Sequence, residues 1–199
     1  MGALFTLLLG PFLLLLTDQT PAGSAAPVRV AIETTEGTIT IEVNTQRAPR
    51  TAANFLHYVD GGFYDGGRFF RVVRMDNQPQ NPVKIEVIQG EAAMDVLKSK
   101  GEAPPIALER TRDTGLRHLD GTVSMARDGP DTATHSFFIC IGDQPSLDFG
   151  GARNPDGQGF AAFGRVLSGM DVVRRIQQMP ASGQTLTNPV TIVRARRVE

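Results

Sequence analysis

The sequence has few of the residues that most often mark redox, metal or hydrolytic chemistry. Its 199 residues include no tryptophan, one cysteine and three histidines. The single cysteine, Cys140, excludes a disulfide within the chain. It lies in the apolar run FFICI, which predicts a small buried side chain, because a reactive thiolate needs an electropositive and partly exposed setting.

The chain also lacks an excess of charge of either sign. Its formal net charge is −1, so no nucleic acid or anionic membrane is expected as a partner held by bulk charge. Basic residues do gather in the closing run VRARRVE, where they alternate with Val and Ala. That alternation is typical of the solvent face of a strand.

Motifs for three further classes of chemistry are missing. His57, His118 and His135 lack metal-ligand spacing, and there is no C-x-x-C or H-E-x-x-H, so no metal site is expected. His135 and Ser136 are adjacent, but neighbours on a strand point to opposite faces, and no G-x-S-x-G elbow occurs. No G-x-G-x-x-G joins a strand to a helix. The sequence therefore argues against a metalloenzyme, a serine hydrolase and a nucleotide-cofactor enzyme, and no cofactor is expected.

The first 26 residues differ in kind from the rest. An apolar run over residues 3–16 precedes a polar turn and a small-residue stretch that ends at residue 26, and no Lys or Arg comes before the run. The run is shorter than the roughly 20 residues that span a bilayer, and it fits the apolar region of a secretory signal. We expect residues 1–26 to be a signal peptide, with an uncleaved N-terminal anchor as the alternative. Residues 27–199 would then form one domain exported to the periplasm or cell envelope.

The pattern after residue 27 predicts an antiparallel β protein. Residues 28–43 place Val and Ile at every second position on either side of Glu36-Gly37, as in a β-hairpin with one buried face. Further strands are predicted at 68–73, 84–89, 121–126, 136–141, 161–166 and 189–198. The long connections between them, among them 75–83 and 90–105, are rich in Gly, Pro and Asp. This pattern indicates a mostly β, closed antiparallel barrel.

Two short helices are predicted over the ends of the barrel. The first begins at Pro49, repeats apolar residues at helical spacing and stops at Gly61-Gly62. The second lies in SGMDVVRRIQQMP, with Ser168 as its N-cap and Pro180 after its end.

Three segments share their order and spacing with one known family. They are RAPRTAANFLHYVDGGFYDGGRFFRVV, then HLDGTVSMARDGPDTATHSFFICIGDQPSLD, then GFAAFGRVLSGMDVV. Together they resemble the cyclophilin family of peptidyl-prolyl cis-trans isomerases, and the match covers nearly all of residues 27–199. The resemblance implies an eight-stranded antiparallel β-barrel capped by two short α-helices.

The resemblance also implies a reaction, which is rotation about the bond before proline. That rotation faces a barrier of about 18–20 kcal/mol, and lowering it by ~7 kcal/mol gives roughly 10⁵-fold acceleration. No covalent bond breaks, so no nucleophile, metal or cofactor is needed. The catalyst has to stabilise a twisted amide whose prolyl nitrogen has regained a lone pair.

Three residues fall on catalytic positions of the family. Arg71, in FFRVV, matches the arginine that hydrogen-bonds the prolyl nitrogen. Gln89, in VIQG, resembles the glutamine that binds the substrate backbone, after an insertion of about ten residues, MDNQPQNPVK. An ungapped alignment would put Pro79 there and lose the following glycine. Phe138 matches the phenylalanine of the proline pocket, and its neighbour Phe137 is predicted to be a core aromatic.

Five more residues are implied to contact the substrate. Leu147 matches the pocket leucine, and Ala126 and Arg127 match the loop that contacts the peptide backbone. Val87 would line the pocket, and Phe160 aligns with a family histidine near it.

Val87 stands where a methionine is usual in the family, and Phe160 where a histidine is. The chain departs from the family pattern at three further positions near the implied pocket. Glu86 stands where a phenylalanine is usual and cannot supply the same apolar surface. Ser136 replaces a common glutamine, and Ser146 stands where many members carry a tryptophan. The resemblance therefore leaves the catalytic efficiency open.

Three hypotheses of function follow. The first is an exported, monomeric isomerase that acts on proline-containing segments of unfolded or folding envelope proteins. The second, motivated by Glu86 and the insertion, is a proline-peptide binding module or holdase chaperone on the same barrel with little turnover. The third is a β-barrel scaffold that binds no proline peptide.

Overall fold

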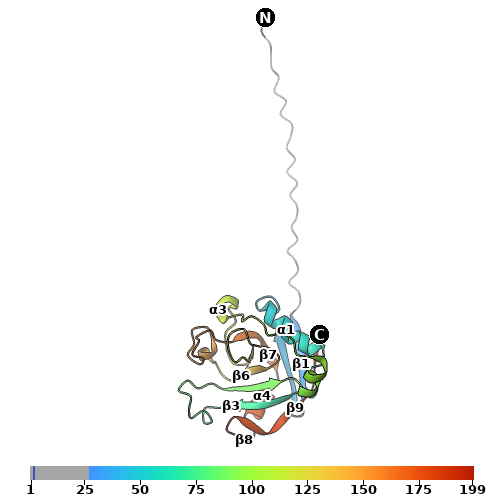
Figure 1. Ribbon diagram of the computed structural model, residues 1–199, viewed down its shortest axis with the longest axis vertical. Helices are drawn as coiled ribbons and strands as arrows, with labels where there is room; N and C mark the ends of the chain where they lie inside the picture. The colour runs from blue at the N-terminus through green and yellow to red at the C-terminus, as the bar shows by residue number, and fades with distance from the viewer. Residues whose placement is uncertain (1, 3–26) are drawn as a thin grey trace.

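The computed structural model describes residue 2 and residues 27–199 (Figure 1). The predicted signal peptide or anchor, residues 1–26, lies outside the described residues except for residue 2. None of the helices in residues 27–199 has the length and apolar character that crossing a bilayer requires. The elements, in chain order, are β1 (Val28–Thr34), β2 (Gly37–Val43), α1 (Pro49–Asp60), β3 (Arg68–Val73), β4 (Val87–Glu91), α2 (Met94–Lys100), α3 (Thr111–Thr114), β5 (Thr122–Met125), β6 (Phe137–Cys140), the 3₁₀ turn η1 (Pro145–Leu147), β7 (Ala161–Ser168), α4 (Met170–Gln177), β8 (Ala181–Ser182) and β9 (Thr185–Val198).

Eight of the strands close into a barrel. The order around it is β1-β2-β7-β5-β6-β4-β3-β9, every described neighbour pair is antiparallel, and β9 returns to pair with β1. The two-residue β8 pairs only with β9. The predicted mostly β, eight-stranded antiparallel barrel is therefore confirmed. Closure leaves the barrel strands without a free sheet edge.

The predicted hairpin at the start of the barrel forms at the expected turn. β1 and β2 pair from Val28↔Val43 to Thr34↔Gly37. Gly37 has φ +132°, and a Cβ added there would lie 2.9 Å from a methyl carbon of Val172 in α4. A glycine is therefore needed at this turn, both for its backbone conformation and for the close approach of α4.

The two predicted helices are present, but the predicted cap of the second is wrong. Helix α1 begins at Pro49 as expected. At the start of α4, Ser168 is the last residue of β7 and pairs with Thr40, and Gly169 takes the N-cap position with φ +93°. Because β7 runs directly into the helix, the backbone needs a left-handed residue there and no side-chain cap forms.

The sequence pattern does not predict two further helices, α2 and α3. Within α2 the buried side chain is Leu97, and α3 is a single turn of four residues. Helices this short carry too few buried residues to show an amphipathic period.

Several strand boundaries differ from the prediction by one or two residues, and the first residues of β4 and β9 differ by more. β4 begins at Val87, not at residue 84, because the backbone at Ile85 bonds to the buried side chain of Gln78 instead of to a strand. β9 begins at Thr185 and runs through Pro189, where the pairing with β3 is irregular. An irregularity of this kind is where a strand tolerates a proline.

Most of the buried apolar side chains in residues 27–199 belong to two clusters. The larger contains Phe55, Phe137 and Ile139 and lies inside the barrel beneath α1 and α4. The second consists of Val73, Ile85, Val87, Phe138, Cys140 and Leu147, with Ala126 and Phe160 packed against it. Because side chains alternate along a strand, β6 sends Phe137 to the first cluster and Phe138 to the second. The prediction that Phe137 is the core aromatic is confirmed.

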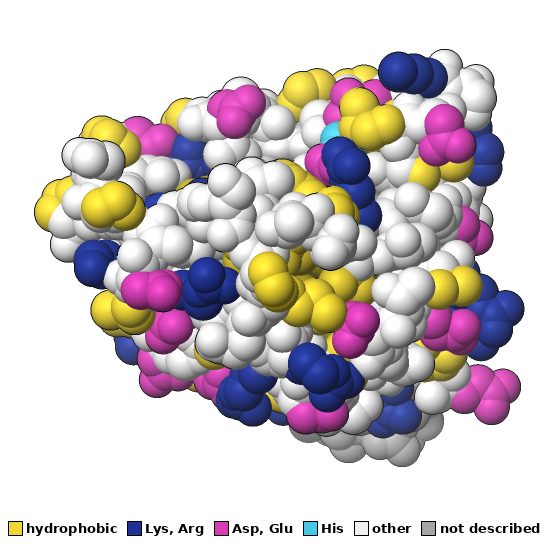
Figure 2. All heavy atoms as spheres, turned by 90° about the horizontal axis from the view of Figure 1, so that it is seen from below, with side chains coloured by type: hydrophobic (Ala, Val, Ile, Leu, Met, Phe, Trp, Pro, Cys, Tyr) yellow, Lys and Arg dark blue, Asp and Glu magenta, His cyan; other side chains and the backbone are white. Residues whose placement is uncertain are grey.

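Basic and acidic side chains are interspersed over the surface, as the face in Figure 2 shows. On β9, Arg194 and Arg196 both contact Glu33, and Arg197 pairs with Asp60. The basic run near the C-terminus therefore lies on a solvated strand face with acidic partners.

Candidate active site

A cavity of about 420 Å³ opens beside the second apolar cluster. All eight side chains that the resemblance implied for the site line this one cavity, although they come from six different parts of the chain. They are Arg71, Val87, Gln89, Ala126, Arg127, Phe138, Leu147 and Phe160.

Arg71 is held at the cavity by three hydrogen bonds to neutral side chains. Its Nη1 donates to Oε1 of Gln89 at 2.8 Å, and the two residues are direct partners across β3 and β4. Its Nε and Nη2 both donate to Oε1 of Gln184, at 3.0 and 2.6 Å. Burial lowers the pKa of Arg71, but an arginine remains charged. Since a guanidinium has five N–H groups, two are left to bind a ligand.

The bond from Arg71 also orients the side chain of Gln89. Its Oε1 accepts from the guanidinium, so its amide nitrogen Nε2 is the atom left to donate. Gln89 is half-buried and lines the cavity. The Arg71 and Gln89 pair thus offers fixed donors for the oxygen and nitrogen atoms of a peptide.

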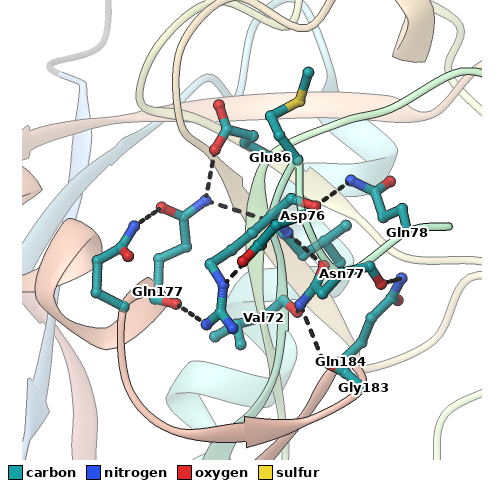
Figure 3. Close-up of polar contacts among 12 residues, drawn as sticks. Val72, Asp76, Asn77, Gln78, Glu86, Gln177, Gly183 and Gln184 are labelled. Atoms are coloured by element: carbon teal, nitrogen blue, oxygen red, sulfur yellow. Dashed lines mark hydrogen bonds and ion pairs between the residues drawn. The ribbon is translucent and has the colours of Figure 1, made fainter.

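Gln184 is a site residue that the sequence did not reveal. It precedes β9 and lies 113 positions from Arg71. Asn77 fixes this turn, since its Nδ2 donates to the carbonyl of Val72 at 3.0 Å and to that of Gly183 at 3.1 Å (Figure 3). The carbonyl of Asn77 in turn accepts from Nε2 of Gln184 at 3.3 Å. The insertion after β3 therefore helps to hold the acceptor of Arg71.

The apolar wall of the cavity is more complete than the sequence suggested. Phe138 is 5% exposed and meets the ring of Phe160 edge to face, with 5.3 Å between centroids. Glu86 lies away from this wall, and its carboxylate accepts from Nε2 of Gln177 in α4 at 3.3 Å (Figure 3). Ile85, which the sequence argument missed, lines the cavity beside Val87. Aliphatic side chains thus take the place of the aromatic surface that Glu86 cannot supply.

A buried polar group supports Phe138 from behind. The ring of His118 stacks on it at 6.0 Å, and Nδ1 of His118 lies 2.7 Å from a carboxylate oxygen of Asp148. Nε2 of His118 lies 3.0 Å from the hydroxyl of Ser124. Burial raises the pKa of Asp148, but its hydrogen bonds with His118 outweigh burial and hold that pKa below its ordinary value.

This Ser–His–Asp chain is not arranged as a nucleophile. Ser124 is 0% exposed and His118 1% exposed, and neither lines the cavity. A hydrolytic serine has to reach its substrate. The group instead packs against Phe138 through the ring of His118.

The prediction that His135 and Ser136 point to opposite faces is wrong. β6 begins only at residue 137, so both lie in the preceding loop and both line the cavity. The hydroxyl of Ser136 is 3.5 Å from Nδ1 of His135, which already accepts the N–H of Ala92 at 3.3 Å. Burial lowers the pKa of His135. A contact this long does not activate a serine.

Cys140 is buried and its thiol is not activated. Cys140 is 0% exposed, and burial raises the pKa of its thiol well above the ordinary value, so it stays protonated. In residues 27–199 there is no group of three or more His, Cys, Asp and Glu side chains that could hold a metal ion.

Residues 29–197 match the family described as cyclophilin type peptidyl-prolyl cis-trans isomerase. The chain belongs to this family. It is 37% identical over 166 residues to peptidyl-prolyl cis-trans isomerase A of Dickeya dadantii, covering 82% of this chain and 79% of the relative. It is 36% identical over 149 residues to peptidyl-prolyl cis-trans isomerase B of Escherichia coli K12, covering 74% of this chain and 83% of that relative. The family suggested by the three segments is confirmed.

Solved cyclophilin structures have the same fold. A crystal structure of a Cryptosporidium parvum cyclophilin type isomerase matches with a TM-score of 0.67 at 20% identity, covering 87% of this chain and 98% of that one. A second structure of that protein, in the presence of the dipeptide Ala-Pro, matches with a TM-score of 0.66. At this identity the likeness supports the barrel alone.

Proposed function

We propose that this protein is a peptidyl-prolyl cis-trans isomerase that uses Arg71 to stabilise the twisted amide. The observation that carries the proposal is the convergence of a fixed guanidinium and an apolar pocket in one cavity. Phe138, Leu147 and Val87 would hold the proline ring while the acyl side rotates. Arg71 would donate to the prolyl nitrogen and Gln89 to a neighbouring backbone carbonyl.

The hydrogen bonds of Arg71 favour the transition state over the planar substrate. The nitrogen of a planar amide has no lone pair to accept a hydrogen bond, and a twisted amide has one. A donor at that nitrogen therefore binds more strongly as the bond twists, which is what lowers a barrier. Gln89 and Gln184 hold the guanidinium in place beforehand, so little reorganisation is needed.

The test of this function is a protease-coupled assay, which measures the rate of cis-to-trans isomerisation of a Xaa-Pro peptide. The wild-type protein should accelerate the cis-to-trans step over the uncatalysed rate, in proportion to protein concentration. An NMR titration of the same peptide should shift the signals of Phe138 and Leu147. Shifts without acceleration would favour the proline-peptide binding module, and the absence of both would favour the scaffold.

We also propose that the protein is exported and acts as a monomer on unfolded or folding proteins of the periplasm or cell envelope. The apolar run at 3–16 and the small residues up to 26 support export. Mass spectrometry of the protein recovered from the envelope fraction will give its N-terminus. An N-terminus near residue 27 is the expected result, and a retained residue 1 would favour the anchor. Sedimentation should give the mass of one chain.

Replacing Gln184 should slow catalysis without unfolding the protein. Gln184→Leu removes the acceptor of two of the three hydrogen bonds of Arg71, and the guanidinium then samples more rotamers. We expect kcat/KM to fall roughly tenfold, the size of one charged hydrogen bond. Gln184→Glu keeps an acceptor and should retain most of the activity. Equal activity in Gln184→Leu and the wild type would exclude this positioning role.

A further inference from the structure

Three guanidinium groups line the site cavity, and they differ in how their charge is balanced. Arg127 is bound on both terminal nitrogens by the carboxylate of Asp156, at 2.8 and 2.9 Å. Arg71 and Arg153 instead donate to amide and carbonyl oxygens, which carry no net charge. Within residues 27–199, neither has an acidic group within ion-pair distance. The cavity therefore holds a surplus of positive charge.

The insertion between β3 and β4 fixes Arg153 at the cavity. Nη1 of Arg153 donates to Oε1 of Gln78 at 2.9 Å and to the carbonyl of Val83 at 2.6 Å. Gln78 (labelled in Figure 3) is 2% exposed, and its Nε2 donates to the carbonyls of Arg74 and Ile85, both at 2.7 Å. A buried, fully bonded glutamine is a rigid support. The insertion therefore positions a positively charged side chain at the cavity.

The remaining donors of Arg153 suit a carboxylate. Its Nε and Nη2 have no acceptor in the part of the chain that the structure describes, and the side chain is half-buried. Neighbouring donors of one guanidinium match the two oxygens of a carboxylate.

The electrostatic surroundings favour an anion as well. Arg71 and Arg153 line the same cavity. Burial lowers the pKa of Arg153, and the positive charge of Arg71 lowers it further. The acidic side chain that lines the cavity, Asp128, is exposed and pairs with neither arginine. A ligand carboxylate would reduce this repulsion.

We propose that Arg153 forms a subsite for an acidic side chain next to the substrate proline, while Arg71 remains free to bind the twisted amide. The preferred substrates are then peptide segments with Asp or Glu beside the proline. This inference rests on the proposed isomerase function and adds a preference among its substrates.

The test compares isomerisation of short peptides blocked at both ends, so that no terminal carboxylate competes. Glu, Ala or Lys is placed on either side of the proline, and NMR exchange gives kcat/KM for each peptide. At one of the two positions beside the proline, kcat/KM for the Glu peptide should exceed that for the Ala peptide by roughly three- to tenfold, as expected for a partly buried ion pair. The Lys peptide should have a lower kcat/KM than the Ala peptide. Added salt should reduce the preference.

Variants of Arg153 separate recognition from support of the loop. In Arg153→Gln, kcat/KM for the Glu peptide should become about equal to that for the Ala peptide. Arg153→Lys keeps the positive charge and should retain part of the preference for Glu. The ratio is the readout, because a loosened loop would lower both peptides together. Arg112→Gln is the matched control, since Arg112 lies over Phe149 outside the cavity, and it should keep the wild-type ratio.

Two results would overturn the inference. One is equal kcat/KM for the Glu and Ala peptides on both sides of the proline in the wild type. The other is an unchanged ratio in Arg153→Gln. Turnover of the Ala peptide reports on the proposed function separately, because its absence in the wild type would contradict isomerase activity itself.

Discussion

Arg71→Ala should reduce kcat/KM for a Xaa-Pro peptide by about 10²- to 10³-fold, the usual effect of removing one preorganised donor to a transition state. Among the described residues that line the cavity, the guanidinium of Arg71 is the group whose donors are held by two other side chains, Gln89 and Gln184. Arg71→Lys should reduce kcat/KM nearly as much, because an ammonium cannot form hydrogen bonds to both glutamines and the substrate in the same plane. The protease-coupled assay measures both.

The matched control is Arg68→Ala, three positions earlier on the same strand. The side chain of Arg68 is 51% exposed and pairs with Glu91 away from the cavity, so its loss should change kcat/KM by less than about twofold. Peptide binding by Arg71→Ala should persist in an NMR titration, because the apolar wall is unchanged. Wild-type turnover in Arg71→Ala would exclude the catalytic role of this arginine.

Phe55→Ala should lower the free energy of unfolding by about 3–5 kcal/mol, as is usual for a large ring removed from a core. The ring is 0% exposed and contacts the rings of Tyr64, Phe137 and Phe163, with centroid distances of 5.4, 5.5 and 4.9 Å. No smaller side chain can keep all three contacts. Urea unfolding followed by circular dichroism gives the change.

The control for this core variant makes the same chemical change on the surface. Phe149 is half-buried and packs under the guanidinium of Arg112 at 4.2 Å, so Phe149→Ala should cost less than about 1.5 kcal/mol. Phe55 lies in the larger cluster and not in the cavity wall. The folded fraction of Phe55→Ala should therefore keep its kcat/KM, and a selective loss of turnover would show that the two clusters are coupled.

The barrel is predicted from local strand alternation, whereas the site residues are implied by the resemblance of three segments to the cyclophilin family. Strand alternation separates Phe137 from Phe138, and the strands that carry Arg71 and Gln89 are visible as apolar runs on either side of the insertion. The eight implied residues all line one cavity. Their catalytic and binding roles stay predictions until the variants above are measured.

The parts that sequence reasoning missed depend on contacts between distant segments. Gln184 reaches Arg71 across 113 positions, and Arg153 reaches Gln78 across 75. Neither glutamine lies in a periodic run, so no pattern marks it. Ile85 was missed for a different reason. The family phenylalanine aligns with Glu86, so the alignment implies no role for Ile85. In the structure, Ile85 supplies apolar surface to the cavity wall.

The arrangement of β4 and β6 has a consequence for folding. Each strand carries core residues on one face and cavity residues on the other, so a shift of pairing by one residue would exchange the two sets. The same pairing register of β4 and β6 therefore buries the core side chains and brings the cavity side chains together. A partly closed barrel would have neither a packed core nor an assembled cavity. We therefore expect isomerase activity to return during refolding only when β4 and β6 are paired, at the same time as the core side chains become fully packed.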